Sequence, residues 1–385
     1  MKENVLIVHG GAPTAVINAS LYGAVTEARR HPRIGAVYGA IGGTGGVLRE
    51  RFFDLKQVSE ERLRLLLSTP GSAIGTSRDV LEAEDYARMI GIMKRHDIRY
   101  VLFNGGNGSM DACGKLKRAG EGGGISFVGI PKTIDNDISV TDHAPGYGSA
   151  ARYMAQTVRE IAQDIKAMPI HVSVVEAMGR NVGWIAAASA LAREGDGDAP
   201  HLIYLPERPF HEEEFFEDVK RLHDQHGGVL VVASEGLKGE DGKPIVPPIF
   251  RVGRSVYYGD VSAHLANLII KRLGIKARNE KPGISGRVSI PFQSIIDRDE
   301  AVLAGRVAAR AALEGQSGVM VGFDREPGEG YNCGTKLIPI DEVMLRERPM
   351  PDAFINDRGN DVTEAFVNWC GPLIGGDLQE FVSFI

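Results

Sequence analysis

A short acidic segment carries the side chains best suited to chemistry. Residues 131–137 read Pro-Lys-Thr-Ile-Asp-Asn-Asp and place a cation (Lys132), a hydroxyl (Thr133) and two carboxylates (Asp135 and Asp137) directly after an apolar run. Two carboxylates spaced in this way on an extended loop can take different roles. One can accept a proton from a hydroxyl substrate, while the other faces a Mg²⁺ ion carried by phosphate oxygens. A turn rich in Asp and Asn is also common without a function, so its surroundings must decide.

Glycine-rich loops favour a catalytic role for the acidic segment over a turn without a function. The chain has 48 glycines among 385 residues, well above the typical share of about 7%. In open α/β sheets, ligands bind at the carboxyl ends of strands, where glycine lets backbone N–H groups and helix N-termini approach an anion. Four such loops follow apolar runs, namely His9-Gly-Gly-Ala-Pro, Gly42-Gly-Thr-Gly-Gly, Gly105-Gly-Asn-Gly-Ser and Met178-Gly-Arg. Together they indicate phosphate chemistry.

Short apolar runs alternate with longer helical patterns along the chain. The expected strands are 5–9, 36–41, 100–104, 125–130, 171–176, 229–233 and 319–323. The expected helices lie near 15–30, 80–96, 109–119, 149–166, 182–193, 212–225, 260–273 and 299–313. Strands with nearly continuous hydrophobicity are typical of burial on both faces, and their alternation with helices predicts an α/β fold with mainly parallel sheets.

Composition narrows the possible partners. Lys plus Arg number 44 and Asp plus Glu 50, so the net charge of −6 gives no general reason to expect nucleic acid or an anionic membrane. The apolar runs are far shorter than the roughly 18 residues of a membrane span, and the N-terminus does not resemble a signal peptide. Cys113, Cys333 and Cys370 are too scattered for a disulfide framework or a zinc site. We therefore expect a cytoplasmic protein that acts on small molecules.

Two common nucleotide motifs are absent or weak. No GxxxxGK[ST] sequence is present, which argues against a P-loop NTPase. Gly146-Tyr-Gly-Ser-Ala-Ala matches GxGxxA, but it follows a polar loop instead of a strand. A dehydrogenase that uses NAD is therefore a poor interpretation.

Four motifs in order resemble the phosphofructokinase A family. They are Gly105-Gly-Asn-Gly-Ser, Pro131-Lys-Thr-Ile-Asp-Asn-Asp, Val174-Val-Glu-Ala-Met-Gly-Arg and the pair Arg278 and Arg287. The resemblance covers about residues 4–323, and residues 10–18 and 359–375 resemble the pyrophosphate-dependent bacterial branch. It implies a glycolytic kinase that transfers the terminal phosphoryl group of ATP or pyrophosphate to the 1-hydroxyl of fructose 6-phosphate with Mg²⁺.

The resemblance also implies the architecture. We expect two Rossmann-like three-layer α/β lobes with mainly parallel sheets, as in phosphofructokinases. Residues 1–146 and 287–330 would form the larger, donor-binding lobe, and residues 147–286 the smaller, sugar-phosphate-binding lobe. Residues 331–385 would be an extension packed on the larger lobe. Because the family shares its phosphate-binding arginines across a subunit boundary, a homodimer or homotetramer is implied.

Residue roles follow from the matched motifs. The implied catalytic residues are Asp135, which accepts the proton of the 1-hydroxyl, with Arg180, Thr133 and Lys132. The donor would be bound by Gly11, Arg78, Gly106, Asn107, Gly108, Ser109 and Lys132, and the metal by Asn107 and Asp137. The sugar phosphate would be bound by Thr133, Asp135, His171, Met178, Gly179, Arg180, Glu235, Arg278 and Arg287.

The chain departs from the family pattern at the donor site. Pyrophosphate users resemble GG[DN]DS, in which the second Asp occupies the space of an ATP α-phosphate. Here that position is Gly108, which admits ATP, whereas Lys132 is the residue of the pyrophosphate branch and permits either donor. We therefore favour ATP and keep pyrophosphate as the alternative. Asn107 replaces the Asp of the ATP enzymes. Its amide oxygen could still ligate Mg²⁺, but it adds no negative charge.

The acceptor site departs as well. The stretch before the second phosphate-binding Arg is Gly283-Ile-Ser-Gly-Arg287, so Ile284 and Gly286 supply no side-chain hydrogen bond. His171 stands where ATP-type members have an Arg, and at neutral pH it offers at most a partial charge. Fructose 6-phosphate remains the favoured acceptor, with a related anionic sugar as the alternative. The same departures leave open a regulator that binds a sugar phosphate or nucleotide without catalysis.

Overall fold

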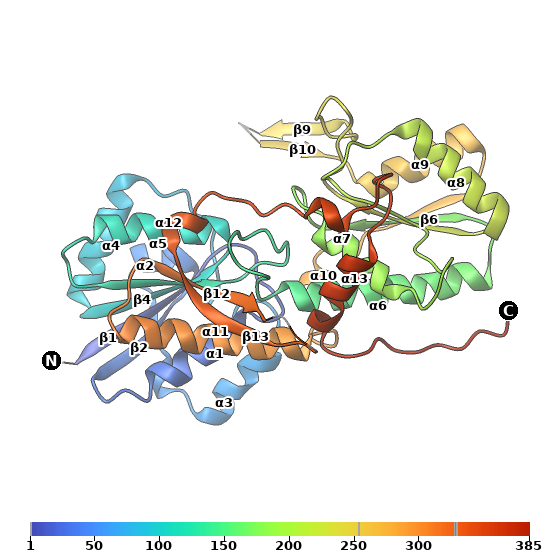
Figure 1. Cartoon of the computed structure of the whole chain (residues 1–385). Helices are drawn as coiled ribbons and strands as arrows, with labels where there is room; N and C mark the ends of the chain where they lie inside the picture. Colours follow the sequence, from blue (N-terminus) through green and yellow to red (C-terminus); the bar gives the residue numbers. More distant parts are fainter. Residues whose placement is uncertain (1, 253–254, 327, 329) are drawn as a thin grey trace. The chain divides into compact units, whose positions relative to one another are not determined.

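The structure, a computed structural model, describes residues 2–252, 255–326, 328 and 330–385. The chain forms two compact units (Figure 1). The first unit consists of Met1–Ser149 and Arg287–Arg348, and the second of Ala150–Gly286 and Pro349–Ile385. Among the described residues, no helix combines the length and hydropathy that a membrane span requires.

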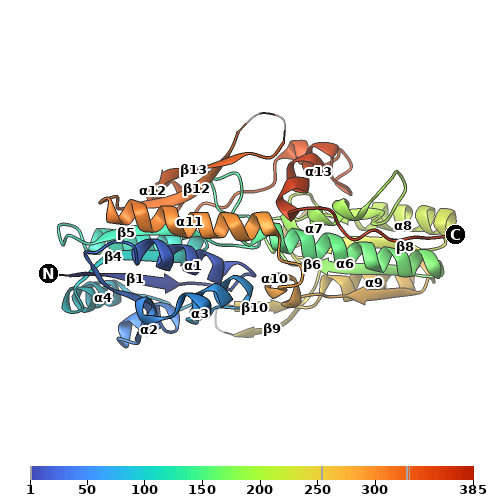
Figure 2. The same ribbon diagram turned by 90° about the horizontal axis from the view of Figure 1, so that it is seen from below.

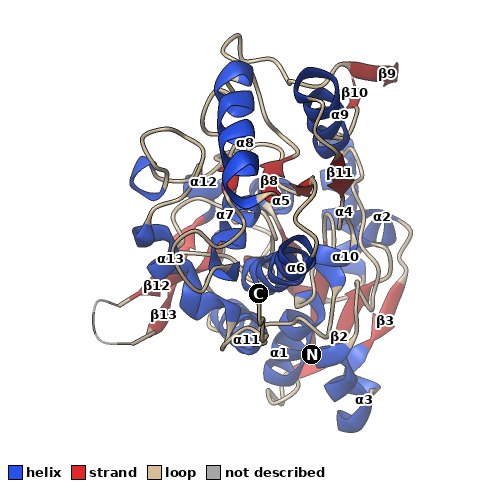
Figure 3. Ribbon diagram, turned by 90° about the vertical axis from the view of Figure 1, so that its right-hand side faces the viewer, coloured by secondary structure: helices blue, strands red, loops and turns tan. Residues whose placement is uncertain are grey.

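The first unit is built on a seven-stranded sheet of order β13-β12-β5-β4-β1-β2-β3. Its strands are β1 (Glu3–His9), β2 (Ile34–Ala40), β3 (Phe52–Asp54), β4 (Ile98–Gly105), β5 (Ser126–Pro131), β12 (Val319–Arg325) and β13 (Cys333–Pro339). Only the edge pairs β2–β3 and β12–β13 are antiparallel; the second of these pairs is visible in Figure 3. His9 pairs with Asn104, and Gly105 with Pro131, so the carboxyl ends of β1, β4 and β5 lie side by side.

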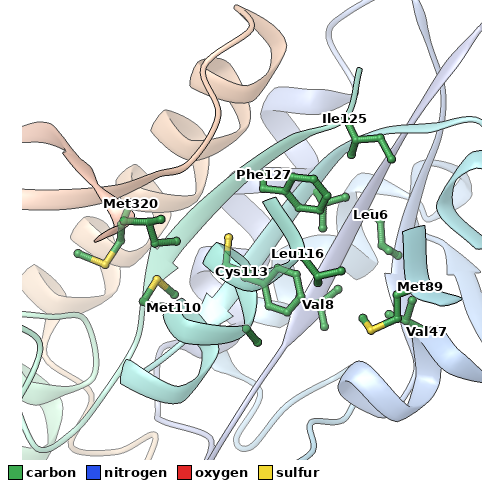
Figure 4. Packing of buried hydrophobic residues seen from close by; sticks show 14 of the residues in the cluster. Leu6, Val8, Val47, Met89, Met110, Cys113, Leu116, Ile125, Phe127 and Met320 are labelled. Atoms are coloured by element: carbon green, nitrogen blue, oxygen red, sulfur yellow. The ribbon is translucent and has the colours of Figure 1, made fainter. Parts of the chain in front are cut away.

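Helices cover both faces of this sheet. On one face, α1 (Ile17–Ala28) and α11 (Ile295–Leu313) pack closely together (Figure 2). A Cβ on Gly23 would lie 2.0 Å from Val302 O, and one on Gly305 would lie 2.0 Å from Ser20 O, so glycine permits this approach. On the other face, α4 (Ala83–Arg95) and α5 (Asn107–Ala119) bury a second cluster (Figure 4). Cys113 lies fully buried in that cluster, where its side chain packs among apolar groups.

The second unit has a four-stranded parallel sheet of order β11-β6-β8-β7. Its strands are β6 (Val172–Ala177), β7 (Leu202–Tyr204), β8 (Val229–Ser234) and β11 (Ala277–Glu280). Apolar side chains of α8 (Glu212–His226) and α9 (Val261–Leu273) pack on the Val and Leu side chains of these strands. The unit also contains α7 (Trp184–Ala188), α13 (Glu364–Cys370) and the hairpin of β9 (Pro248–Val252) and β10 (Ser255–Tyr258). The chain passes between the units in α6 (Tyr147–Ala167) and α10 (Ser285–Val288).

The expected α/β fold with mainly parallel sheets is confirmed, and every expected strand is present within one or two residues. The strands that we did not expect are β3, β7, β9, β10, β11 and β13. Each is an edge strand or part of a hairpin, and β11 reads Ala-Arg-Asn-Glu. Most such strands bury little apolar surface, so they lack the hydrophobic run by which a buried parallel strand is identified. The exception is β7, which is fully buried but only three residues long.

The C-terminal extension corrects one expectation. We expected all of residues 331–385 to pack on the larger lobe, but only the part up to Arg348 belongs to the first unit. β13 pairs with β12 there, as an antiparallel edge strand. Residues 349–385 belong to the second unit, where the ring of Trp369 lies 4.9 Å from that of Trp184. The amino-acid composition of residues 331–385 could not predict that the two parts of this segment belong to different units.

Candidate active site

A cavity of about 440 Å³ lies at the carboxyl ends of β1, β4 and β5; we call it the first-unit cavity. Parallel pairing of these strands brings three loops to one place. Ten of the residues expected from the motifs line it, namely Gly11, Arg78, Gly106, Asn107, Gly108, Ser109, Lys132, Thr133, Asp135 and Asp137. The acidic segment therefore shares one site with the glycine loops that begin at His9 and Gly105, whereas the Met178-Gly-Arg loop does not line this cavity.

Two glycines allow the loops to approach the first turn of α5. A Cβ on Gly10 would lie 2.2 Å from Ser109 Oγ, so that hydroxyl would have to rotate away. One on Gly105 would lie 2.0 Å from the same Oγ and 2.4 Å from Ser109 Cβ, so Gly105 does not accept a side chain. Gly106 is the N-cap of α5, a helix of 13 residues. The first N–H groups of a helix lack partners within it, and its dipole favours negative charge. This end of the cavity is suited to an anion.

Lys132 supplies a buried positive charge. The residue is 3% exposed, and its Nζ donates a hydrogen bond to Ala12 O at 2.5 Å. Burial lowers the pKa of Lys132 to about 8, although the charges of Asp135 and Asp137 act in the opposite direction. The ammonium is thus mostly charged at neutral pH, in surroundings where water screens it weakly. Arg287, expected at the sugar phosphate, lies outside the lining but close enough to lower the same pKa.

The acidic turn is held by its own side chains. Thr133 Oγ1 donates to Asp137 Oδ1 at 2.9 Å and accepts from Asp135 N at 3.1 Å. Asn107 Nδ2 donates to Asp137 Oδ2 at 3.0 Å, which ties the turn to the start of α5. Both carboxylate oxygens of Asp137 are therefore oriented, and Asp135 lines the cavity. The two acids have different surroundings, as two separate roles require.

The site also fits a hard divalent cation. The Oδ1 atom of Asn107 is buried and has no hydrogen-bond partner among the described residues. Its amide lies beside the carboxylate of Asp137. Amide and carboxylate oxygens are ligands that Mg²⁺ accepts, commonly together with water and substrate phosphates. Asn107 and Asp137, the two expected metal residues, thus offer a compatible set of oxygens.

In the second unit, the residues expected to bind the sugar form two groups. Met178, Gly179 and Arg180 follow β6, and Gly179 N donates to Glu235 Oε1 at 3.2 Å. Gly179 has a φ of 116°, and a Cβ there would meet Val182 O at 2.5 Å, so glycine is required at this bend. The structure therefore brings Glu235 to the Met-Gly-Arg loop.

His171 and Arg278 form the other group, in a separate cavity of about 280 Å³, the second-unit cavity. Glu160, Asp164 and Glu280 line the same cavity. Burial and then the charge of Arg278 lower the pKa of His171 below its ordinary value, so the imidazole is neutral at neutral pH. Arg278 is thus the one cation beside three carboxylates in this lining.

Two residues of the first unit were missed. His9 is fully buried directly before Gly10; burial and then Lys132 lower its pKa to about 3. Its ring bonds to Ser72 Oγ at 2.8 Å and to Asn104 at 3.2 Å. Asp79, in the cavity lining, accepts from Thr44 Oγ1 at 2.7 Å and from Gly45 N at 2.6 Å. In the sequence, His9 directly precedes Gly10 and Asp79 directly follows Arg78. This adjacency to expected site residues could have identified both.

A glycine-rich cavity that holds Lys132 and Arg78 beside the carboxylates of Asp135 and Asp137 has the composition of a phosphoryl-transfer site. The family described as Phosphofructokinase matches residues 4–312, and this chain belongs to it. It is a phosphotransferase with an alcohol group as acceptor. The resemblance of the four motifs is thereby confirmed.

Several relatives cover almost the whole chain. A pyrophosphate–fructose 6-phosphate 1-phosphotransferase of Rhodospirillum rubrum is 37% identical over 98% of this chain and 96% of the relative. A sulfofructose kinase of Alkalicoccus urumqiensis is 33% identical over 96% of this chain and 95% of the relative. The crystal structure of a pyrophosphate-dependent phosphofructokinase from Marinobacter aquaeolei has a TM-score of 0.89 and 34% identity, over 99% of this chain and 94% of that one.

Proposed function

We propose that this enzyme transfers the terminal phosphoryl group of ATP to the 1-hydroxyl of fructose 6-phosphate, as a step of glycolysis. The observation that carries the proposal is the first-unit cavity, where Asp135 shares one lining with Lys132, Arg78 and the N-terminus of α5. A base beside a group of anion-binding donors suits a reaction in which a hydroxyl loses a proton as it attacks a phosphoryl group. Pyrophosphate, the donor in the names of several relatives, is the alternative.

Each residue of the cavity then has a role. Asp135 accepts the hydroxyl proton, and Thr133 holds the turn. Lys132 and Arg78 neutralise charge on the phosphoryl oxygens, while Gly11, Gly106, Gly108 and Ser109 contact the donor. Gly11 N already donates to Ser77 O at 3.0 Å and Ser109 N to Gly106 O at 2.9 Å, so the backbone N–H groups that would bind the donor phosphates are those of Gly106 and Gly108. Asn107 and Asp137 would hold Mg²⁺ together with the donor phosphates, and the ion would supply further charge neutralisation.

The second unit would supply the groups that bind the sugar. We assign Met178, Gly179, Arg180 and Glu235 to the sugar, with Arg180 also neutralising charge on the transferring group. His171 and Arg278 of the second unit, and Arg287 of the first unit, would contact the anionic group of the acceptor. We also propose that the enzyme is a homodimer or homotetramer in the cytoplasm.

A sulfonated sugar is a second candidate acceptor. In the second-unit cavity His171 is neutral, and three carboxylates offset the charge of Arg278. The small positive charge that remains suits a monoanion better than a phosphate dianion. Ile284, 63% exposed, adds no hydrogen-bond donor. The sulfofructose kinase relative shows that the family includes an enzyme named for such a substrate.

A crossed assay tests these proposals. ATP and pyrophosphate are each combined with fructose 6-phosphate and 6-deoxy-6-sulfofructose, with Mg²⁺ or with EDTA. We expect turnover with ATP and fructose 6-phosphate that EDTA abolishes. A higher kcat/KM for 6-deoxy-6-sulfofructose than for fructose 6-phosphate would identify the sulfonate as the acceptor. A higher kcat/KM for pyrophosphate than for ATP would identify pyrophosphate as the donor. Tight calorimetric binding without turnover in any combination would instead support the non-catalytic regulator.

Gly108→Asp should change the donor preference. A Cβ at Gly108 meets no atom within 4 Å, so the variant has room to fold. A carboxylate there would repel and crowd the ATP α-phosphate, and like charges in contact cost several kcal/mol, so kcat/KM for ATP should fall about 100-fold or more. The value for pyrophosphate should fall less or rise.

Gly91→Asp in α4 is the matched control, because it adds the same charge to the first unit outside the cavity lining. An unchanged ratio of the two donors in Gly108→Asp would refute the steric explanation.

A further inference from the structure

The turn that carries Asp135 rests on residues 141–149, which we call the support loop. Thr133 N donates to Pro145 O at 3.1 Å, and Thr133 forms a bridge with Gly146. Ala144 N donates to the side-chain Oδ1 of Asn136 at 3.1 Å, inside the protein. Asn136 has a φ of 55°, so this bond also stabilises an unfavourable backbone conformation. A shift of the support loop would therefore shift the acidic turn.

Helix α11 holds one end of the support loop through Asp297. This buried carboxylate accepts hydrogen bonds from Gly146 N at 2.7 Å, from Ser149 N at 2.9 Å and from Ser149 Oγ at 2.5 Å. Burial raises the pKa of Asp297 to about 6, although these bonds favour the charged form. Glu300 lies one helical turn further along α11, where it meets the middle of the loop.

His143 connects the middle of the support loop to Glu300. Its Nδ1 lies 2.9 Å from Asp142 Oδ2 and its Nε2 lies 2.7 Å from Glu300 Oε2, while the residue is 2% exposed. Carboxylates only accept, so both ring nitrogens donate when the imidazole is doubly protonated. Burial alone would lower the pKa of His143, but the bonds to Asp142 and Glu300 raise it to about 9. The ring also stacks on Phe323 at 5.0 Å between centroids.

Other elements supply the remaining charged and titratable groups around this ring. The hydroxyl of Tyr331 donates to Glu300 Oε1 at 2.5 Å, and Cys333 lies beside the same carboxylate. Arg325, at the end of β12, pairs with Asp142 at 3.2 Å, and Arg348 also faces Asp142. The imidazolium of His143 and the guanidinium groups therefore offset the buried carboxylate of Glu300 and the partly exposed one of Asp142.

We propose that His143 is a positioning residue, which fastens the support loop to Glu300 and so holds Asp135 in place for proton transfer. This inference rests on the function proposed above. Without the imidazolium, the buried carboxylate of Glu300 would lose its cationic partner, the link from Asp142 through the ring to α11 would be broken, and the loop would move away from α11. A small displacement of a catalytic base is costly, because proton transfer requires close and aligned groups.

His143→Gln tests the proposal, since Gln can bond to one carboxylate but carries no charge. Peptides covering residues 132–149 should exchange their backbone hydrogens about tenfold faster or more, with the rest of the chain unchanged. The kcat should fall about 10- to 100-fold, with little change in either KM. Glu27→Gln, which loses the ion pair between the buried Glu27 carboxylate of α1 and the exposed Arg310 of α11, is the control for a general loss of stability.

Glu300→Gln adds a readout that depends on pH. The amide oxygen of Gln can still accept from Nε2, but the pKa of His143 should fall by roughly 1–3 units without the carboxylate charge. Exchange of residues 132–149, corrected for intrinsic rates, should then accelerate at a correspondingly lower pH than in the wild type.

Hydrogen exchange needs no turnover, so it decides the role of His143 even if the wild type fails to phosphorylate any acceptor. Unchanged exchange in His143→Gln would overturn the proposal. So would a kcat, per folded protein, equal to that of Glu27→Gln.

Discussion

Asp135→Asn is expected to lower kcat about 10²- to 10⁴-fold, the usual contribution of a general base. The amide has nearly the same shape as the carboxylate, but it cannot accept the proton of the 1-hydroxyl. Thr133 should still donate to Asp137 and accept from the backbone of residue 135, so the turn keeps its form. Both KM values should change little, because the variant loses an interaction with the transition state.

Steady-state kinetics with the donor and acceptor identified by the crossed assay measure this effect. Asp224→Asn, on the exposed face of α8, makes the same chemical change at a surface ion pair and should keep wild-type rates. If Asp135→Asn remained fully active, Asp135 could not be the base and the proposed mechanism would be wrong.

Lys132→Met should lower kcat/KM for the donor about 10²- to 10³-fold, as removal of one preorganised charge-stabilising group does elsewhere. Lys132 is buried next to the backbone of the Gly11 loop, where water screens its charge only weakly. Its positive charge therefore acts strongly on a bound phosphate. Lys220→Met, on the exposed face of α8, controls for the loss of one positive charge.

The pH dependence gives an independent check on Lys132. The active form is protonated, and burial lowers its pKa to about 8. The wild-type kcat/KM for the donor should therefore fall as the pH rises through about 8. Lys132→Met should lack this decline. A decline at the same pH in the variant would assign the titration to another group.

The loops that line the first-unit cavity were predicted from the sequence. Gly11, Gly106, Lys132 and Asp135 each follow a strand with a continuous apolar run. Such strands are recognisable because both of their faces are buried, and parallel neighbours end at the same edge of the sheet. Local sequence therefore predicted which loops meet. Individual roles for these residues stay predictions that the variants above test.

Contacts between distant residues were not predicted. His143 and Glu300 are 157 positions apart, and Trp184 meets Trp369 from the far end of the chain. Neither pair leaves a periodic or spaced pattern, because nothing in the local sequence specifies which surfaces of a fold are complementary. The split of the C-terminal extension between the units was wrongly predicted for the same reason.

The amino-acid sequence by itself determined the reactive groups of this protein, the α/β class and the family, since these depend on residue type, local order and the hydrophobic period. Only the tertiary structure decided the environment of each group. It buried Lys132 and lowered its pKa, left His171 neutral beside Arg278 and placed His143 between two carboxylates. Burial and electrostatic surroundings arise from packing between segments that are distant in the chain, and local sequence does not encode that packing.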